Sequence, residues 1–356
     1  MFKSLTIKNF RCFNQLNLSQ LRRINLIGGV NNAGKTALLE ALFLQVSVDV
    51  FELPLRLNLI RGVRQETLDV EEICEWLFCE KRTETSVEIS AANEENQQNE
   101  LKLSLVQASK TRLFPINPPI SNRKTRILKD LKLEYRDFSG EATVWTVFLT
   151  VDSESPDEIK ISLNLETGQL QPLPPSTFIG TKGRSYDDVE KFSLLEADKR
   201  QEEILEIIQL LEPRLKRLTV LVIGGVAMIY GDIGSSHLIP LPLMGEGLGR
   251  LLSIALAIAN SRGGTVLIDE IENGLHHSVL EKIWKAIAIA AQQSNTQIFA
   301  TTHSLECIRA AHQAFSQTQE YDFAYHRLEP VHGEVKSISY DRDNIETSLE
   351  MNFEMR

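Results

Sequence analysis

The sequence predicts an α/β fold in which a mostly parallel sheet is combined with an antiparallel β lobe and a helical insertion. Three observations carry this prediction. Between Ile24 and Leu44, an apolar run, a glycine-rich turn and a helical run follow one another. Two further apolar runs, Thr265 to Glu270 and Thr296 to Ala300, end in polar residues as buried parallel strands do. The central region consists of short runs with a period of two, which is typical of an antiparallel sheet with one solvated face.

The glycine-rich turn is a phosphate-binding pattern. Residues 29 to 36 read G-V-N-N-A-G-K-T and match GxxxxGKT in full. They lie between the apolar residues Ile24, Leu26 and Ile27 and the helical run Ala37 to Leu44, which is the strand, loop and helix context that this pattern requires. The competing interpretation is a turn that precedes a lysine by chance. It is disfavoured because all four fixed positions match in the right context.

Each residue type in this loop has a physical reason. Glycines let the backbone curl around phosphate oxygens, so that consecutive N–H groups and a helix N-terminus point at the anion. Lys35 is expected to reach the β and γ phosphates, and Thr36 to offer its hydroxyl to Mg²⁺. The predicted nucleotide-binding residues of the loop are Gly29, Asn31, Asn32, Ala33, Gly34, Lys35, Thr36 and Ala37.

Composition is typical of a globular protein of a reducing compartment. The 356 residues are 42% apolar, and 38 basic against 48 acidic groups give a net charge of −10, which excludes a generally basic DNA-binding protein. Cys12, Cys74, Cys79 and Cys307 show no metal-ligand spacing, and Cys74 and Cys79 are expected in the core. The N-terminus lacks a signal-peptide pattern and the apolar run Leu251 to Ala259 is short, so a cytoplasmic protein without a membrane contact is expected.

A second block, Thr265 to Glu270, reads T-V-L-I-D-E and predicts a buried strand with carboxylates at its carboxyl end. Asp269 is the expected Mg²⁺-side carboxylate, and Glu270 the expected base that orients the attacking water. The strand Thr296 to Ala300 leads to T-T-H-S, which places His303 where it could bond a γ-phosphate oxygen. Taken singly, an acidic pair often ends a strand in solvent, and a lone histidine is often an ordinary loop residue. Their order after the phosphate-binding loop favours the functional interpretation.

With these motifs the chain resembles the ABC-type ATPase heads of the RecF, SMC and OLD group. The opening L-T-I-K-N-F-R-C-F, the run N-N-A-G-K-T-A-L-L-E-A-L, the block D-E-I-E-N-G-L-H-H and T-T-H-S match that group in order. It is most similar to standalone OLD-like AAA family ATPases, which carry no fused Toprim domain and whose Walker B segment reads D-E-x-E-x-x-L-H. The matching segments cover residues 1–44 and 241–310. The resemblance implies a P-loop NTPase with ATP and Mg²⁺ as ligands and ATP hydrolysis as the reaction; the preference for ATP over GTP rests on this likeness.

The resemblance also implies a homodimer with composite ATP sites, in which the loop of one head faces a signature loop of the other. The matching segment is Leu243 to Arg250, followed by an expected helix, Leu251 to Asn260. Gly245 and Gly247 are then expected to supply loop flexibility and backbone donors. Met244 stands where relatives carry a serine, and the plain alternative is a glycine-rich loop that caps a helix. The glutamine that couples nucleotide to the lobe interface stays open among Gln45, Gln107 and Gln169.

The region between the matching segments predicts five strands and a helical region. The strands are expected at Thr85 to Ala91, Leu101 to Gln107, Leu131 to Tyr135, Thr143 to Val151 and Ile159 to Leu165. A helical region is expected at Tyr186 to Leu211, and a hairpin at Leu218 to Asp232. The tail predicts two strands and a helix, Asn344 to Glu350. One ABC-type domain is therefore expected over 1–356, with core segments 1–50 and 215–356, a β lobe at about 80–175 and a helical subdomain at about 186–213.

Three functions of different class are compatible with this pattern. The first is a regulatory ATPase that controls a separately encoded effector, such as a nuclease in defence or DNA metabolism. The second is a repair ATPase that clamps DNA directly, for which the basic stretch Gln107 to Arg126 is the best local candidate, although a solvated loop explains that stretch as well. The third is a transporter motor, which the Met244 departure and the F-R-C-F opening disfavour.

Overall fold

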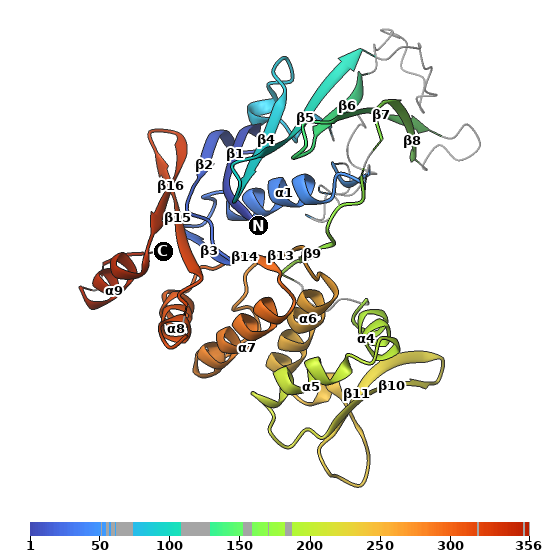
Figure 1. Cartoon of the computed structure of the whole chain (residues 1–356), viewed down its shortest axis with the longest axis vertical. Helices are drawn as coiled ribbons and strands as arrows, with labels where there is room; N and C mark the ends of the chain where they lie inside the picture. The colour runs from blue at the N-terminus through green and yellow to red at the C-terminus, as the bar shows by residue number, and fades with distance from the viewer. Residues whose placement is uncertain are drawn as a thin grey trace, which may run out of the picture.

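The computed structural model describes residues 1–50, 52–54, 57, 61, 74–107, 129–151, 159–169, 171–181, 187–318, 320–351 and 353–355. In this part of the chain the strands form three sheets of six, seven and three strands. Figure 1 shows two main layers of sheet with the helix α1 between them and a helical layer on the far side of the smaller main sheet. The basic stretch noted above lies almost entirely outside the described residues.

The parallel sheet has the strand order β16-β15-β3-β14-β13-β9. All neighbours pair in parallel except β15 and β16, which form an antiparallel hairpin. Its strands are β3 (Ile24–Gly29), β9 (Ser176–Ile179), β13 (Thr265–Ile268), β14 (Gln297–Thr301), β15 (Phe323–Val331) and β16 (Glu334–Tyr340). The central strands β3, β13 and β14 are buried along their whole length, because helices cover both faces.

The two faces of this sheet pack against different helices. Leu267 and Phe299 belong to the apolar cluster around α1 (Lys35–Val46), whereas Val266, Ile268 and Ile298 belong to the opposite cluster. This division follows from the period of two along a strand. The opposite cluster includes α6 (Glu246–Asn260), α7 (Leu280–Gln293), α8 (Leu305–Ser316) and α9 (Arg342–Glu350). The sheet thus carries α1 on one side and the other helices of the core on the other (Figure 1).

The antiparallel sheet has the strand order β2-β1-β4-β5-β6-β7-β8. The five strands expected from the alternating runs are all present, and the first two strands of the chain join them. The members are β1 (Phe2–Phe10), β2 (Phe13–Leu18), β4 (Val87–Asn93), β5 (Gln98–Gln107), β6 (Lys129–Arg136), β7 (Ala142–Val151) and β8 (Ile159–Thr167). The N-terminal hairpin therefore pairs with the lobe rather than with the parallel sheet, although it falls in the segment 1–50.

The helical region divides into α4 (Asp188–Ala197) and α5 (Gln201–Gln209). The predicted helical region thus consists of two helices, and Lys199 between them takes a positive φ of 59°. The chain then enters the hairpin of β10 (Arg217–Ile223) and β11 (Val226–Asp232), and β12 (Ile239–Pro240) completes a small sheet. Short 3₁₀ turns lie at Cys79–Lys81, Leu241–Leu243 and His277–Val279.

Cys74, Cys79 and Cys307 are buried as free thiols, in line with the expectation for the first two. Burial raises the pKa of the Cys307 thiol to about 12. Among the described helices, none combines the length and the apolar character that crossing a bilayer requires.

Candidate functional site

The loop between β3 and α1 has a backbone that only glycine fits at two positions. Gly29 has a φ of 139°, and a Cβ there would stand 2.4 Å from the carbonyl oxygen of Leu328. Gly34, at the start of α1, has a φ of 94°, and its Cβ would stand 2.7 Å from both Cys12 Sγ and the Phe13 ring. An added side chain would clash at both positions and would also be strained by the positive φ. The sequence between the glycines is thereby held as a tight loop at the N-terminus of a helix.

Most of the predicted loop residues line one cavity of 750 Å³. Asn31, Asn32, Gly34, Lys35, Thr36 and Ala37 lie on its wall, together with Glu270 and His303. Ala33 is fully buried instead, and its N–H donates to the carbonyl of Val30 over 3.2 Å. The remaining lining residues are Arg11, Cys12, Arg61, Trp76, Phe78, Glu80 and Lys81, of which the sequence analysis named none as a site residue.

Lys35 folds back over the loop from which it starts. Its ammonium donates to the carbonyl oxygens of Gly29 over 2.7 Å and of Val30 over 2.9 Å. The side chain is only 5% exposed, and burial lowers the pKa of Lys35, against the nearby carboxylates of Asp269, Glu270 and Glu272, which raise it. An ammonium has three N–H donors. Two of them hold the Lys35 side chain across the loop, and the third is available to an anion in the cavity.

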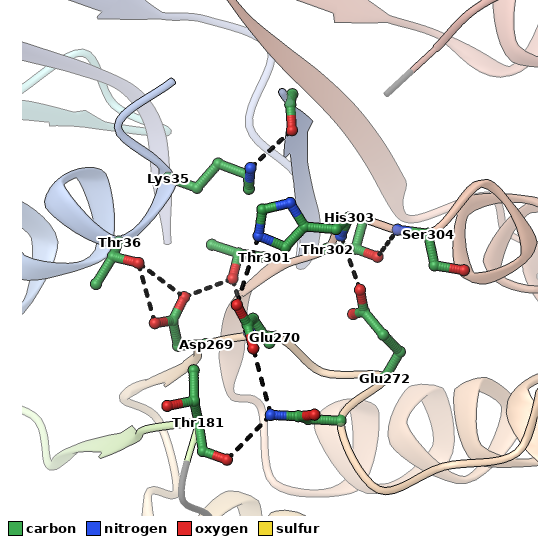
Figure 2. Close-up of polar contacts among 12 residues, drawn as sticks. Lys35, Thr36, Thr181, Asp269, Glu270, Glu272, Thr301, Thr302, His303 and Ser304 are labelled. Atoms are coloured by element: carbon green, nitrogen blue, oxygen red, sulfur yellow. Dashed lines mark hydrogen bonds and ion pairs between the residues drawn. The ribbon is translucent and has the colours of Figure 1, made fainter. Parts of the chain in front are cut away.

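Asp269 hydrogen-bonds residues from two distant parts of the chain. Its Oδ2 accepts a hydrogen bond from Thr36 Oγ1 over 3.0 Å, and its Oδ1 accepts one from Thr301 Oγ1 over 2.6 Å (Figure 2). The parallel register places these groups side by side, because β14 pairs with both β3 and β13. Asp269 is only 6% exposed. Residues that lie 233 positions apart in the chain therefore meet at the start of α1.

Glu270 follows in a strained conformation that turns it toward the cavity. Its φ is 48°, in the left-handed region, and its N–H donates to Thr301 Oγ1 over 2.8 Å. The carboxylate lies 3.5 Å from His303 Nε2 and accepts from Asn273 Nδ2 over 3.3 Å (Figure 2). Non-glycine residues with such backbone angles are costly and cluster at functional sites. The same threonine hydroxyl thus supports both Asp269 and Glu270, a role that the polar residues after β14 could have suggested.

His303 is positioned by the carboxylate of Glu272, which lies in the turn after β13. Glu272 Oε1 accepts a hydrogen bond from the backbone N–H of His303 over 2.7 Å. Glu272 belongs to the D-E-I-E motif, but its contact with His303 depends on the tertiary structure. The following helix α8 begins with Ser304 as its N-cap, whose hydroxyl accepts from Cys307 N. The loop that carries His303 is therefore fixed at both of its ends.

Arg250 supports the acidic turn from behind. It is 5% exposed, and its guanidinium donates to the carbonyl oxygens of Gly180, Asp269 and Glu270 over 3.2, 3.1 and 3.3 Å. Burial lowers the pKa of Arg250, against the charges of Asp269 and its acidic neighbours. Because Arg250 belongs to α6, hydrogen bonds connect this helix to the turn that carries Glu270.

The segment before α6 differs from the expectation in one respect. The helix begins at Glu246, five residues before the expected Leu251, so Gly247 lies in its first turn and supplies no loop flexibility. Gly245 is the N-cap residue, with a φ of 119° and open space around its Cβ position. Met244 packs against the core cluster next to Gly231. Neither Gly245 nor Gly247 lines the cavity described above.

The chain is similar to several known proteins. The family model described as "AAA domain, putative AbiEii toxin, Type IV TA system" matches residues 24–309, which is most of the chain. A protein of Helicobacter pylori named "ATP/GTP phosphatase" is 25% identical over 344 residues, which cover 91% of this chain and 90% of that protein. An uncharacterized protein of Methanocaldococcus jannaschii is 42% identical over 65 residues, which cover 18% of this chain and 57% of that protein.

Among solved structures, an SMC head bound to the C-terminal winged-helix domain of ScpA superposes with a TM-score of 0.51. The superposition covers 98% of this chain and 99% of the SMC head, at 13% sequence identity. At this identity the likeness concerns the fold alone. It agrees with the predicted arrangement of a P-loop ATPase head with a mostly parallel sheet and an antiparallel lobe.

Proposed function

The chain belongs to this AAA-domain family and is an ATPase, and we propose that it binds ATP with Mg²⁺ in the cavity over the β3–α1 loop and hydrolyses it with a water that Glu270 activates. The contact of Thr36 with Asp269, next to Lys35, carries this proposal. It joins the phosphate-binding loop to the carboxylates that follow β13 in the way that a triphosphate with a divalent ion requires. The name of the Helicobacter pylori relative, "ATP/GTP phosphatase", supports the reaction class.

The phosphates would lie against the loop amides and Lys35. The N-terminus of α1 favours negative charge, and a loop at such a terminus can offer backbone N–H donors to an anion. Lys35 adds a full positive charge in a largely desolvated place, where electrostatic interactions are stronger than in water. In this role the bonds from Lys35 to Gly29 and Val30 keep the ammonium extended over the loop before the nucleotide arrives.

The oxygen groups of Thr36 and Asp269 fit Mg²⁺. Two ligands at neighbouring corners of an octahedron with bonds of ~2.1 Å lie ~3.0 Å apart. The hydroxyl of Thr36 and Oδ2 of Asp269 are 3.0 Å apart in the structure. Mg²⁺ takes one or two protein ligands together with phosphate oxygens and water, so this pair suffices. When bound, the ion neutralises charge on the β and γ phosphates.

Glu270 and His303 would act at the γ-phosphate end. Glu270 accepts a proton from, or a hydrogen bond of, the water that attacks in line with the leaving oxygen. His303 lies 3.5 Å from that carboxylate on a loop that Glu272 holds, and its imidazole is placed to bond a γ-phosphate oxygen or to orient Glu270. The support that Thr301 and Arg250 give to this turn keeps the base aimed before the substrate binds, which is the main device of such catalysis.

The biological role proposed is that of a regulatory subunit. In this proposal two chains associate around ATP, with the Gly245 segment and the start of α6 facing the cavity of the partner. The exposed position of Gly245, outside its own cavity, supports a contact in trans. Arg250 on α6 donates a hydrogen bond to the carbonyl oxygen of Glu270. A partner chain that packs against α6 would therefore change the position of Glu270 through Arg250. A separately encoded effector, such as a nuclease, would read the dimer state; the toxin and the TA system of the family description support a role of this kind.

Glu270→Gln tests the proposal. The change keeps the size of the side chain and removes its basicity, so ATP turnover should fall at least about a hundredfold while ATP affinity stays unchanged. Phosphate release and equilibrium binding of ATP measure the two effects, and light scattering with ATP should show an increase of the dimer. The matched control is Glu281→Gln on α7, whose carboxylate pairs with Lys285 at the surface. Turnover of Glu270→Gln at the parental rate would remove this residue from the mechanism.

The proposed partner requires a separate test. The Glu270→Gln chain should retain the effector more firmly than the parent in the presence of ATP, and Lys35→Ala should not retain it. Tagged chains recovered from the native host, with and without ATP, would show this difference. Recovery of a membrane permease, or of DNA alone, would contradict the regulatory role and leave the ATPase chemistry intact.

A further inference from the structure

The cavity over the phosphate-binding loop extends to a wall that the proposed chemistry does not use. Trp76, Phe78, Glu80 and Lys81 form this wall, and Arg11, which also lines the cavity, contacts both Trp76 and α1. Trp76 is 48% exposed, whereas the two other tryptophans of the chain, Trp145 and Trp284, are 0% and 1% exposed. A large indole that faces a cavity instead of the core indicates a binding surface.

Trp76 is tied to the helix that carries Lys35. Its carbonyl oxygen accepts from Arg11 Nη1 over 3.0 Å, and the backbone N–H of Arg11 donates to the carbonyl of Leu77 over 2.9 Å. The guanidinium of Arg11 also donates from Nε to Glu40 Oε2 over 3.1 Å. Glu40 lies on α1 and is 1% exposed. The backbone of Trp76 therefore has a fixed position relative to the phosphate-binding loop.

The turn after Trp76 is also built for a specific shape. Glu80 and Lys81 follow one another with φ values of 51° and 56°, in the left-handed region that side chains rarely adopt. The ammonium of Lys81 is thereby placed 4.3 Å from the centre of the Trp76 ring. Strain of this kind is retained where the surroundings impose it, and it is common at ligand sites. The cation engages the ring by a cation–π contact and adds positive charge to the rim of the cavity.

We propose that Trp76 stacks on the purine base of the nucleotide whose phosphates lie on the β3–α1 loop, with Lys81 as a cationic neighbour of the stack. The inference rests on the proposed function, since it places the base end of the same nucleotide. Every base has a π-face, so stacking holds a base without reading its edge. Among the described lining residues at this end, the largely buried side chain of Arg11 is bound to Glu40 and to the carbonyl oxygen of Trp76. The site should therefore accept ATP and GTP with similar affinity, and pyrimidine nucleotides, with their smaller rings, less well.

The fluorescence of the parent chain offers a direct test. Of the three tryptophans, Trp76 alone is exposed. A ligand that stacks on it should therefore quench a large part of the fluorescence that Trp76 emits. With Mg²⁺ present, ATP and GTP should both quench, whereas inorganic tripolyphosphate should bind to the loop and compete with ATP without quenching. Quenching by tripolyphosphate equal to that by ATP would mean that the indole senses the phosphates alone, and would overturn the stacking.

Variants separate the base from the phosphates. Trp76→Ala should lower the affinity for ATP and for GTP about tenfold or more, in keeping with the loss of one base stack. It should leave the affinity for tripolyphosphate unchanged. Trp76→Phe should restore most of the lost affinity. Phe353→Ala, which removes another exposed aromatic ring, is the control for a general effect of such a change. Unchanged ATP affinity in Trp76→Ala would overturn the stacking and leave the proposed function standing. A parent chain that bound neither ATP nor tripolyphosphate would overturn both.

Discussion

The two ends of the nucleotide cavity are built in different ways. The phosphate end consists of backbone N–H groups, short side chains and charges that the parallel sheet brings together, as the contacts of Thr36, Asp269 and Thr301 illustrate. The base end consists of long or aromatic side chains, Arg11, Trp76 and Lys81, on the antiparallel lobe and the segment that precedes β4. The first end is held by hydrogen bonds of Asp269 with Thr36 and Thr301. The second is held by hydrogen bonds of Arg11 with Trp76, Leu77 and Glu40.

This difference indicates how the site divides selectivity. Charges and amides in a fixed, desolvated place discriminate strongly for a triphosphate with its ion. An aromatic face adds affinity for any purine but discriminates little between them. In the proposed arrangement the protein selects the triphosphate of its substrate and tolerates different purine bases. The predictions below test whether the phosphate end is indeed the dominant one.

The largest effect is expected from Lys35→Ala. The ammonium of Lys35 lies over the loop next to Gly29. Its removal should weaken the binding free energy of ATP by about 3 kcal/mol or more, because the interaction is charged and largely desolvated. Titration calorimetry with ATP and with tripolyphosphate should show the same loss for both ligands. Lys285→Ala, at the exposed surface of α7, is the matched control. If Trp76→Ala cost more affinity than Lys35→Ala, the order of the two ends would be reversed.

A smaller effect is expected from Glu272→Ala. The change removes the acceptor that holds the backbone N–H of His303 over 2.7 Å, so the loop at the phosphate end should lose its alignment. Turnover should fall by about tenfold while ATP affinity stays unchanged, since one hydrogen bond to a charged group contributes ~1.5–3 kcal/mol. Glu272→Gln keeps an acceptor oxygen and should recover part of the rate. Equal losses in both variants would show that the charge of Glu272, and not the hydrogen bond, is what matters.

A separate effect, on stability rather than on affinity or turnover, concerns the sheet beneath the phosphate end. His326 pairs in register with Ile27 on β3 and is fully buried, with its Nδ1 3.0 Å from Ser339 Oγ. Burial lowers the pKa of His326 from 6.5 to about 4. The unfolded chain therefore binds a proton more readily, and the free energy of unfolding should fall as the pH drops from 6.5 toward 4. Between about pH 7.5 and about pH 5 the loss from this group is on the order of 2 kcal/mol.

Urea unfolding of the parent chain and of His326→Phe at the two pH values measures this contribution. The variant should be less stable at the higher pH, because it loses the contact with Ser339, but its stability should fall less on acidification. An equal fall in both chains would assign the acid sensitivity to other groups. Hydrogen exchange should place the acid-induced opening at β15 and β3, under the phosphate end, rather than at the lobe.

The sequence predicted the elements that depend on local patterns. The strand, loop and helix around Gly34 and the strands that precede Asp269 and His303 lie within a residue or two of their expected bounds, because apolar runs, glycines and polar ends are local signals. The same holds for four of the five strands expected in the lobe, whereas β5 begins three residues before its expected start. The start of α6 at Glu246 was missed, since two glycines in its first turn resemble a loop.

The sequence by itself therefore determines the chemical groups of the phosphate site: a glycine loop with a lysine, and carboxylates that follow a buried strand. Their meeting was decided by the parallel register, which brings Asp269 within hydrogen-bond distance of Thr36. The base end was decided wholly by tertiary structure. Nothing in the neighbourhood of Trp76 in the sequence distinguishes it from a core residue, and only the packing of its segment on Arg11 and α1 leaves the indole facing the cavity. Local patterns report which backbone a segment prefers, whereas a side chain from a distant segment reaches a site only through long-range pairing.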